Sequence, residues 1–208
     1  FLPPPTNHLI FEQNKKNNLK ESRRLLHIGG KAAVHDRNGT NSVLEMLKYS
    51  KEDYELVIRS QTKLDNQNND SRLIVECRNE PTHSELYNGY DAMILPRRYA
   101  GLCLPMNEAL LSGLPVFMTD ISPNNLILPK EWLAKSYGIG KFMARSMIDI
   151  NEASPKILAK IIDEYFQNQD MVSQKQKAFD IGYNMFSYES LRQKYIDLIN
   201  LIGDKNVT

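Results

Sequence analysis

Five short and almost purely apolar runs constrain the fold of this chain more than any other feature of its sequence. They occupy residues 25–28, 55–58, 73–76, 91–95 and 116–118. Each has the length of a strand, and each ends at a glycine, a proline or a polar loop. Runs without polar alternation are typical of strands that are covered on both faces, as in a parallel sheet.

Apolar residues recur at helical spacing in four other segments, residues 40–47, 107–112, 154–167 and 188–202. Thr40 or Asn41 is suited to cap the first of these helices, and Gly113 to end the second. Strands therefore alternate with helices along the chain. The pattern predicts an α/β fold, a Rossmann-like parallel sheet with helices on both faces.

Composition narrows the classes of function. The chain has 208 residues, 41% of them hydrophobic, with 26 Lys and Arg against 25 Asp and Glu, a net charge of +1. This balance supplies no excess positive field for binding nucleic acid. Because no apolar run approaches the roughly 18 residues of a membrane span, and no signal peptide is recognisable, we expect a soluble, cytoplasmic protein.

The metal-binding residue types are scattered. Cys77 and Cys103 each lie in an apolar stretch and are expected to be small core residues. The acidic residues do not cluster with His or Cys at metal-ligand spacing, so we predict no metal site. His27 ends an apolar strand, and an interior histidine with satisfied ring nitrogens is favoured there over a ligand.

The loop after the first strand combines a glycine turn with two cations just before a helix. Gly29 and Gly30 are followed by Lys31 and Arg37. Backbone amides, a helix N-terminus and cations together favour a phosphate or diphosphate. A plain surface loop with solvated cations is the alternative, since both the dinucleotide glycine fingerprint and the P-loop pattern are absent.

A second candidate segment, residues 96–110, places Glu108 in a helix that begins near a glycine-containing turn. A carboxylate there is able to accept two hydrogen bonds from a ribose diol, while amides of the turn meet phosphate or sugar oxygens. The alternative is an ordinary charge on a helix face, paired with water or with a nearby Arg.

Three collinear segments resemble a known family. Residues 108–116 (EALLSGLPV), 86–96 (LYNGYDAMILP) and 27–39 (HIGGKAAVHDRNG) are similar to motifs of nucleotide-sugar-dependent glycosyltransferases with the GT-B fold, most similar to retaining family 4. The linker-like PPPTN near the N-terminus and the FSYE helix near the C-terminus fit the same order. The resemblance implies one lobe of a GT-B enzyme.

The resemblance also implies roles for individual residues. Lys31 and Arg37 match the basic pair that holds the donor diphosphate and neutralises the charge that develops on it, a catalytic role. Glu108 matches the acid that binds the ribose hydroxyls, and Arg78 lies where the family places the nucleobase. The remaining donor-binding positions are Gly29, Gly30, Gly101, Leu102, Cys103 and Leu104.

By the same resemblance, the donor substrate is a nucleoside-diphosphate sugar, and the sugar is transferred with retention of configuration and without a metal or cofactor. The acceptor is unknown, and an N-terminal lobe absent from this chain is expected to hold it. We expect residues 1–23 to be an interdomain linker and lead-in and residues 24–185 to be the donor-binding domain. Residues 186–208 are expected to form a helix that packs toward the other lobe.

The chain departs from the family pattern at one important position. Seven residues separate the family's paired acids, and Ala100 stands where the first acid is expected before Glu108. A non-catalytic Rossmann-like interaction module that has lost the donor-sugar site is therefore the alternative function. An NAD-dependent or P-loop enzyme is disfavoured, because its glycine fingerprint is missing.

Overall fold

A parallel sheet forms the centre of the computed structural model, which describes residues 2–31, 35–64, 69–78, 80–99, 101–167 and 170–204. Within these residues the sheet has six strands in the order β3-β2-β1-β4-β5-β6. They are β1 (Arg24–Gly30), β2 (Glu55–Ser60), β3 (Leu73–Glu76), β4 (Ala92–Leu95), β5 (Val116–Thr119) and β6 (Leu133–Ala134). In register, Leu25 pairs with Leu56 of β2 and with Ala92 of β4. The predicted fold class is confirmed.

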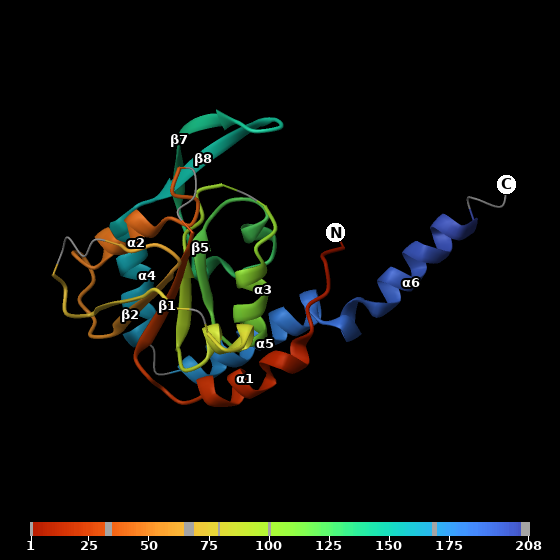
Figure 1. Cartoon of the computed structure of the whole chain (residues 1–208), viewed down its shortest axis with the longest axis horizontal. Helices are drawn as coiled ribbons and strands as arrows, with labels where there is room; N and C mark the ends of the chain where they lie inside the picture. Colours follow the sequence, from red (N-terminus) through yellow and green to blue (C-terminus); the bar gives the residue numbers. More distant parts are fainter. Residues whose placement is uncertain are drawn as a thin grey trace.

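Helices cover both faces of the sheet (Figure 1). On one face α2 (Thr40–Met46) packs against α4 (Pro155–Gln167), and on the other α3 (Leu104–Leu111) packs against α5 (Met171–Phe186). Gly182 explains how closely α5 approaches α3, because a Cβ at this position would lie 2.8 Å from the Leu111 amide nitrogen. The strands β4 and β5 are buried along their whole length, as their apolar sequences require.

Several short elements complete the described chain. The 3-10 helices are η1 (His8–Phe11), η2 (His83–Tyr87), η3 (Asn124–Leu126) and η4 (Lys130–Trp132). An antiparallel hairpin of β7 (Ser136–Met143) and β8 (Met147–Ala153) stands apart from the main sheet. The sequence patterns predicted neither this hairpin nor α5, and α3 begins at Leu104, three residues before the predicted start. Among the described residues, no helix is long and apolar enough to cross a bilayer.

The start of α2 differs from the prediction. Thr40 is the first residue of the helix, and the capping position belongs to Gly39, with φ of 71°. The Asp36 carboxylate caps the helix by accepting hydrogen bonds from the amides of Thr40 and Asn41 at 2.9 and 3.0 Å. Burial raises the pKa of Asp36 from its ordinary value, and these two amides oppose that rise. The Thr40 hydroxyl is instead bonded to His27.

The segment before β1 packs on the domain through η1 and α1 (Glu12–Asn18). Phe11 is fully buried in the main core. The Asn18 side chain donates to the carbonyls of Tyr87 and Ser112 and accepts from the amide of Gly89. This asparagine therefore joins the lead-in to two loops of the sheet. The predicted domain boundaries, between residues 23 and 24 and between residues 185 and 186, stay a prediction.

A buried ion pair connects the same lead-in to β4 and α5. The Lys175 Nζ of α5 lies 2.5 Å from the Asp91 carboxylate, and the two side chains are 2% and 0% exposed. The same carboxylate accepts from the amides of Ser22 and Arg24, and the same ammonium donates to the Asn18 carbonyl. Both buried charges are therefore hydrogen-bonded, as a charge removed from water must be.

Removing the cation should destabilise the fold strongly. We expect Lys175→Met to lower the free energy of unfolding by about 3–5 kcal/mol, because Asp91 is left as an uncompensated buried charge. The matched control is Lys177→Met on the same helix, which breaks an exposed ion pair with Glu131 and should cost at most about 1 kcal/mol. Urea unfolding followed by circular dichroism measures both. Equal losses in the two variants would contradict the proposed importance of the buried pair.

His27 is the interior histidine that the sequence predicted. Its Nδ1 lies 2.8 Å from the Ile94 carbonyl, which only accepts, so Nδ1 carries the proton. Its Nε2, 2.9 Å from the Thr40 hydroxyl, therefore accepts. Complete burial lowers the pKa of His27 to about 4, and the hydrogen bond to Ile94 opposes this only in part. The ring links β1, β4 and α2 in its neutral form.

Stability should fall in mildly acidic solution because of His27. Between pH 6.5 and 4 the unfolded chain binds a proton at this residue that the folded chain does not, so lower pH favours unfolding. From pH 7.5 to pH 5 the loss should be about 2 kcal/mol for the native chain. Urea titrations at both values, repeated on His27→Gln, isolate the effect. Equal losses of unfolding free energy in the native chain and in His27→Gln would refute this role of His27.

Candidate functional site

The candidate site lies where the sheet reverses the direction of its strand order. The strands β1 and β4 are neighbours in the sheet, although β2 and β3 come between them in the chain. The connections after β1 and after β4 leave toward opposite faces of the sheet, and in open α/β sheets ligands bind in the crevice between such connections. The first predicted site segment, residues 29–40, begins at the end of β1, and the second, residues 96–110, directly follows β4.

The glycine loop after β1 is held in shape by Asn38. Its amide donates to the carbonyls of Ile28 and Gly29 at 3.1 and 3.2 Å, while Gly30 takes a φ of 62°. The first predicted cation of this loop, Lys31, is exposed. Residues 32–34 of the same predicted loop lie outside the described part of the chain.

Gly39 brings this loop against the segment after β4. Its φ is 71°, and a Cβ there would clash with the Pro96 carbonyl oxygen. A side chain at this position would therefore strain the backbone and also separate the two loops that form the site. The close approach is possible only for glycine.

Replacing Gly39 should test this close approach. We expect Gly39→Ala to lower the free energy of unfolding by about 2 kcal/mol or more, because both the left-handed backbone and the contact with Pro96 oppose a methyl group. Gly138→Ala is the control, since a Cβ there meets nothing within 4 Å, and it should change stability by at most about 0.5 kcal/mol. Denaturant unfolding of the two variants checks the prediction, which fails if they are equally stable.

Two arginines converge on the turn after β4. A Cβ at Gly101 would lie 3.0 Å from the Arg37 Nη2 and 3.8 Å from the Arg97 Nη2. Arg97 is 4% exposed, and its Nη1 donates to the carbonyls of Gly101 and Leu102. The Nε atoms of both arginines are buried and have no hydrogen-bond partner among the described residues. Adjacent guanidinium groups with unused donors favour an anion between them.

The turn itself leads into α3. Cys103 precedes the helix and is 6% exposed, and burial raises the pKa of its thiol. Leu102 and Leu104, the two predicted donor-binding residues on either side, are 62% and 52% exposed. The prediction for Cys103 as a core residue is confirmed. For Cys77 it is wrong, because this residue follows the last residue of the short strand β3, where the chain reaches the surface.

Glu108 of α3 is held by two residues of η2. The Tyr87 hydroxyl donates to its Oε2 at 2.5 Å, and His83 Nε2 lies 2.9 Å from the same oxygen. Burial and the neighbouring carboxylate raise the pKa of Tyr87 well above its usual range, so the hydroxyl remains a donor. The carboxylate is thus oriented from one side, and Oε1 takes part in neither contact.

A cavity of about 430 Å³ extends from Tyr87 toward the strand ends. Its lining includes Ile28, Gly30, Arg78, His83 and Pro105. A smaller cavity of about 210 Å³ is lined by Arg37 and other residues of the glycine loop. The two cavities share Gly30 and Ser60 in their linings, so they adjoin at the end of β1.

Charged side chains form the far wall of the larger cavity. Arg59 at the end of β2 contacts the carboxylates of Glu76 and Glu80. Arg78, the predicted nucleobase residue, lies 3.5 Å from each of the same two carboxylates and is 64% exposed. Among the described residues, no group of His, Cys, Asp and Glu is arranged to hold a metal ion.

The structure brings most of the predicted site residues to one edge of the sheet. Arg37 meets Gly101, and the larger cavity joins Arg78 and Gly30 to the residues that hold Glu108. Sequence reasoning missed Arg97 and the partners of Glu108. The only sequence signal for Arg97 is its place in a basic doublet directly after a strand. Ala100, which replaces the expected acid, lies outside the described residues.

Solved structures with the same fold are numerous. Sucrose-phosphate synthase from Thermosynechococcus elongatus superposes with a TM-score of 0.71 at 12% identity, over 98% of this chain and 52% of that one. The Anabaena protein HepE, in complex with UDP and glucose, superposes with a TM-score of 0.68 at 10% identity, over 96% of this chain and 56% of that one. This chain therefore spans about half the length of these two neighbours.

A third neighbour is a single domain. The C-terminal domain of a group 1 family glycosyl transferase, LpcC, from Francisella tularensis has a TM-score of 0.62 at 14% identity, over 88% of this chain and 98% of that one. No known protein family and no curated protein matches the sequence. The comparisons establish the fold of one GT-B lobe, with its Rossmann-like parallel sheet.

Proposed function

We propose that this chain is the donor-binding lobe of a glycosyltransferase and binds a nucleoside-diphosphate sugar. The observation that carries the proposal is the convergence of Arg37 and Arg97 on Gly101, beside the two adjoining cavities. A diphosphate is the anion whose size and charge suit two guanidinium groups at a glycine loop. HepE, which has the same fold, has been crystallised in complex with UDP and glucose.

The rest of the donor fits the same edge of the sheet. Oε1 of Glu108 would accept from the ribose hydroxyls, while Tyr87 and His83 contact the other oxygen. The nucleobase would occupy the cavity of about 430 Å³ beside Arg78. In this arrangement the diphosphate extends from the ribose toward Arg37, along Gly29 and Gly30.

The chemistry expected of such a lobe is electrostatic. As the bond between sugar and diphosphate breaks, negative charge grows on the diphosphate, and Lys31, Arg37 and Arg97 would stabilise it. We also propose that the sugar is transferred with retention of configuration, without a metal and without a covalent nucleophile on this chain. The resemblance to retaining family 4 supports that part.

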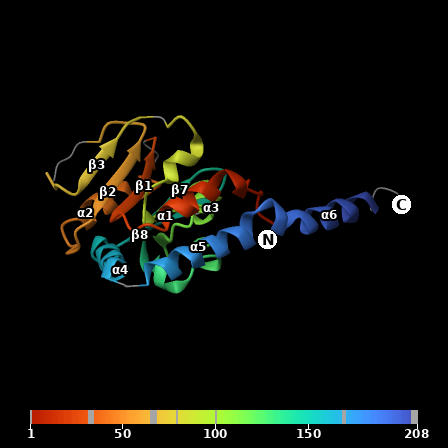
Figure 2. The same ribbon diagram turned by 90° about the horizontal axis from the view of Figure 1, so that it is seen from below.

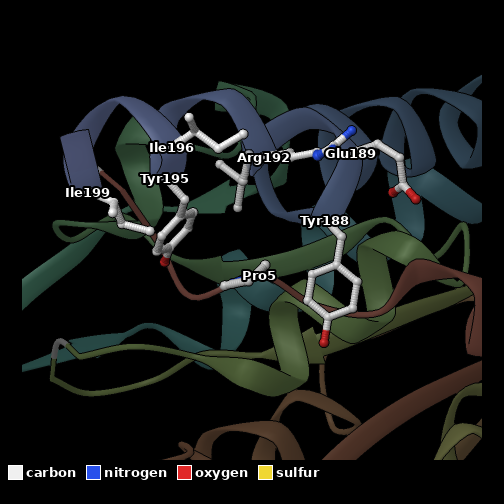
Figure 3. Close-up of a pocket in the computed structure, with 8 residues that line it drawn as sticks. Pro5, Tyr188, Glu189, Arg192, Tyr195, Ile196 and Ile199 are labelled. Atoms are coloured by element: carbon white, nitrogen blue, oxygen red, sulfur yellow. The ribbon is translucent and has the colours of Figure 1, made fainter.

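A second lobe would complete the enzyme and hold the acceptor. The helix α6 (Tyr188–Asp204) extends away from the domain (Figure 2) and exposes Ile199, Leu201 and Ile202 by 54–64%. A groove of about 450 Å³ lies between α6 and Pro5, and Figure 3 shows Tyr188 and Tyr195 reaching down on either side of this proline. The span of about half the sucrose-phosphate synthase and HepE chains also supports a second lobe.

Nucleotide binding by the isolated chain tests the proposal directly. We expect UDP, GDP or ADP to bind in titration calorimetry, and Glu108→Ala to weaken binding by about 1–3 kcal/mol through loss of the ribose hydrogen bonds. Arg37→Ala should weaken binding of the nucleoside diphosphate by a similar amount, because the cation that meets the diphosphate is lost. The control is Arg192→Ala on α6, which lines neither the cavity of about 430 Å³ nor that of about 210 Å³ and should bind nucleotide like the native chain. Failure of every nucleotide to bind would refute the proposal.

A non-catalytic module remains the second candidate, since Ala100 replaces the expected acid. The two functions differ in turnover. A glycosyltransferase joined to its other lobe should hydrolyse or transfer the sugar of its nucleotide donor, whereas a module that has lost the donor-sugar site should release none. Chromatographic detection of the free nucleoside diphosphate distinguishes them.

A further inference from the structure

The β7–β8 hairpin contacts the segments that form the candidate site, although the proposed function assigns it no role. In Figure 1 it projects from the end of the sheet at which the loop after β1 lies. Phe142 pairs with Ile148 across the hairpin, and both are half-buried on the side facing the domain. The next cross-strand pair of the hairpin is Met143 and Met147, which are 69% and 56% exposed.

Phe142 connects the hairpin to the arginine of the diphosphate site. Its ring centroid lies 5.0 Å from that of Tyr99, in an edge-to-face arrangement at 65°. The guanidinium of Arg37 in turn lies 5.3 Å from the Tyr99 ring centroid, within cation–π range. Phe142 also contacts the His35 ring, with centroids 5.0 Å apart. An aromatic chain thus leads from the hairpin to Arg37.

Arg98 holds the base of the hairpin against these segments. Its carbonyl accepts from the Asn151 amide at 2.7 Å, and its Nη2 lies 3.4 Å from the Glu152 carboxylate. Its own amide donates to the Arg37 carbonyl, and its Nη1 to the His35 carbonyl, both at 2.9 Å. The hairpin and the diphosphate loop are therefore joined at two places, through Arg98 and through Phe142.

We propose that Phe142 is a positioning residue for the donor diphosphate. It supports the Tyr99 ring, and the Tyr99 ring holds the Arg37 guanidinium over the site before the ligand arrives. An arginine side chain left free must lose rotamer freedom when it binds, so holding it in advance increases affinity for the phosphate that it meets. The inference rests on the proposed function and adds the hairpin to the donor site.

The test compares two nucleotides that differ by one phosphate. Affinities for UMP and UDP, or for GMP and GDP if the chain prefers guanine, are measured by titration calorimetry. In Phe142→Ala the preference for the diphosphate over the monophosphate should fall about three- to ten-fold, with the monophosphate affinity unchanged. Phe142→Tyr should retain the native preference, and so should Met143→Ala, the control on the outer face of the hairpin.

Two further variants make the outcome decisive. Phe142→Leu keeps an apolar side chain without the ring and should lose the preference even if the alanine variant folds poorly. In an Arg37→Ala background, Phe142→Leu should cause no additional loss, because the two residues act through one interaction. An unchanged diphosphate preference in folded Phe142→Leu overturns the inference and leaves the proposed function standing. If the native chain binds no nucleotide, the proposed function itself fails.

Discussion

The buried pair of Lys175 and Asp91 is the interaction on which the arrangement of the elements depends. Two opposite charges without solvent are stable only when each also has hydrogen-bond partners. Here those partners come from the lead-in, through Ser22 and Asn18, and from Arg24 at the start of β1. The lead-in, the start of β4 and α5 are therefore placed together, and α5 in turn places α3 through the contact at Gly182.

That placement has a consequence for the site. The helix α3 carries Glu108, and the turn before it carries Gly101. The adjacency of β1 and β4 brings the glycine loop to the same edge, and Gly39 allows it to touch the Pro96 segment. The candidate site is thus assembled from two connections that leave the sheet toward opposite faces.

The sequence predicted five of the six described strands of the main sheet, because strands such as β4 and β5 are buried along their whole length and are therefore apolar. It did not predict β6, which has only two residues. It gave no sign of α5, since the buried positions of that helix include Lys175, Ala178 and Gly182, which do not form an apolar stripe. The hairpin was missed for a related reason. It lies outside the main sheet with much of its surface exposed, so few of its residues need to be apolar.

By itself, the sequence determined the α/β class, the five strands β1 to β5 and the helices α2, α3, α4 and α6. It also determined the chemical groups that follow the strands: the glycines, Lys31, Arg37 and Glu108. These features depend on local burial and turn geometry, and short patterns of residues in the sequence indicate both. Only the tertiary structure decided that Arg97 meets Arg37 at one glycine, and that Tyr87 and His83 orient Glu108. It also decided that Phe142 reaches Tyr99. Such contacts join distant parts of the chain, and they depend on which strands become neighbours in the sheet and on how the helices pack against them.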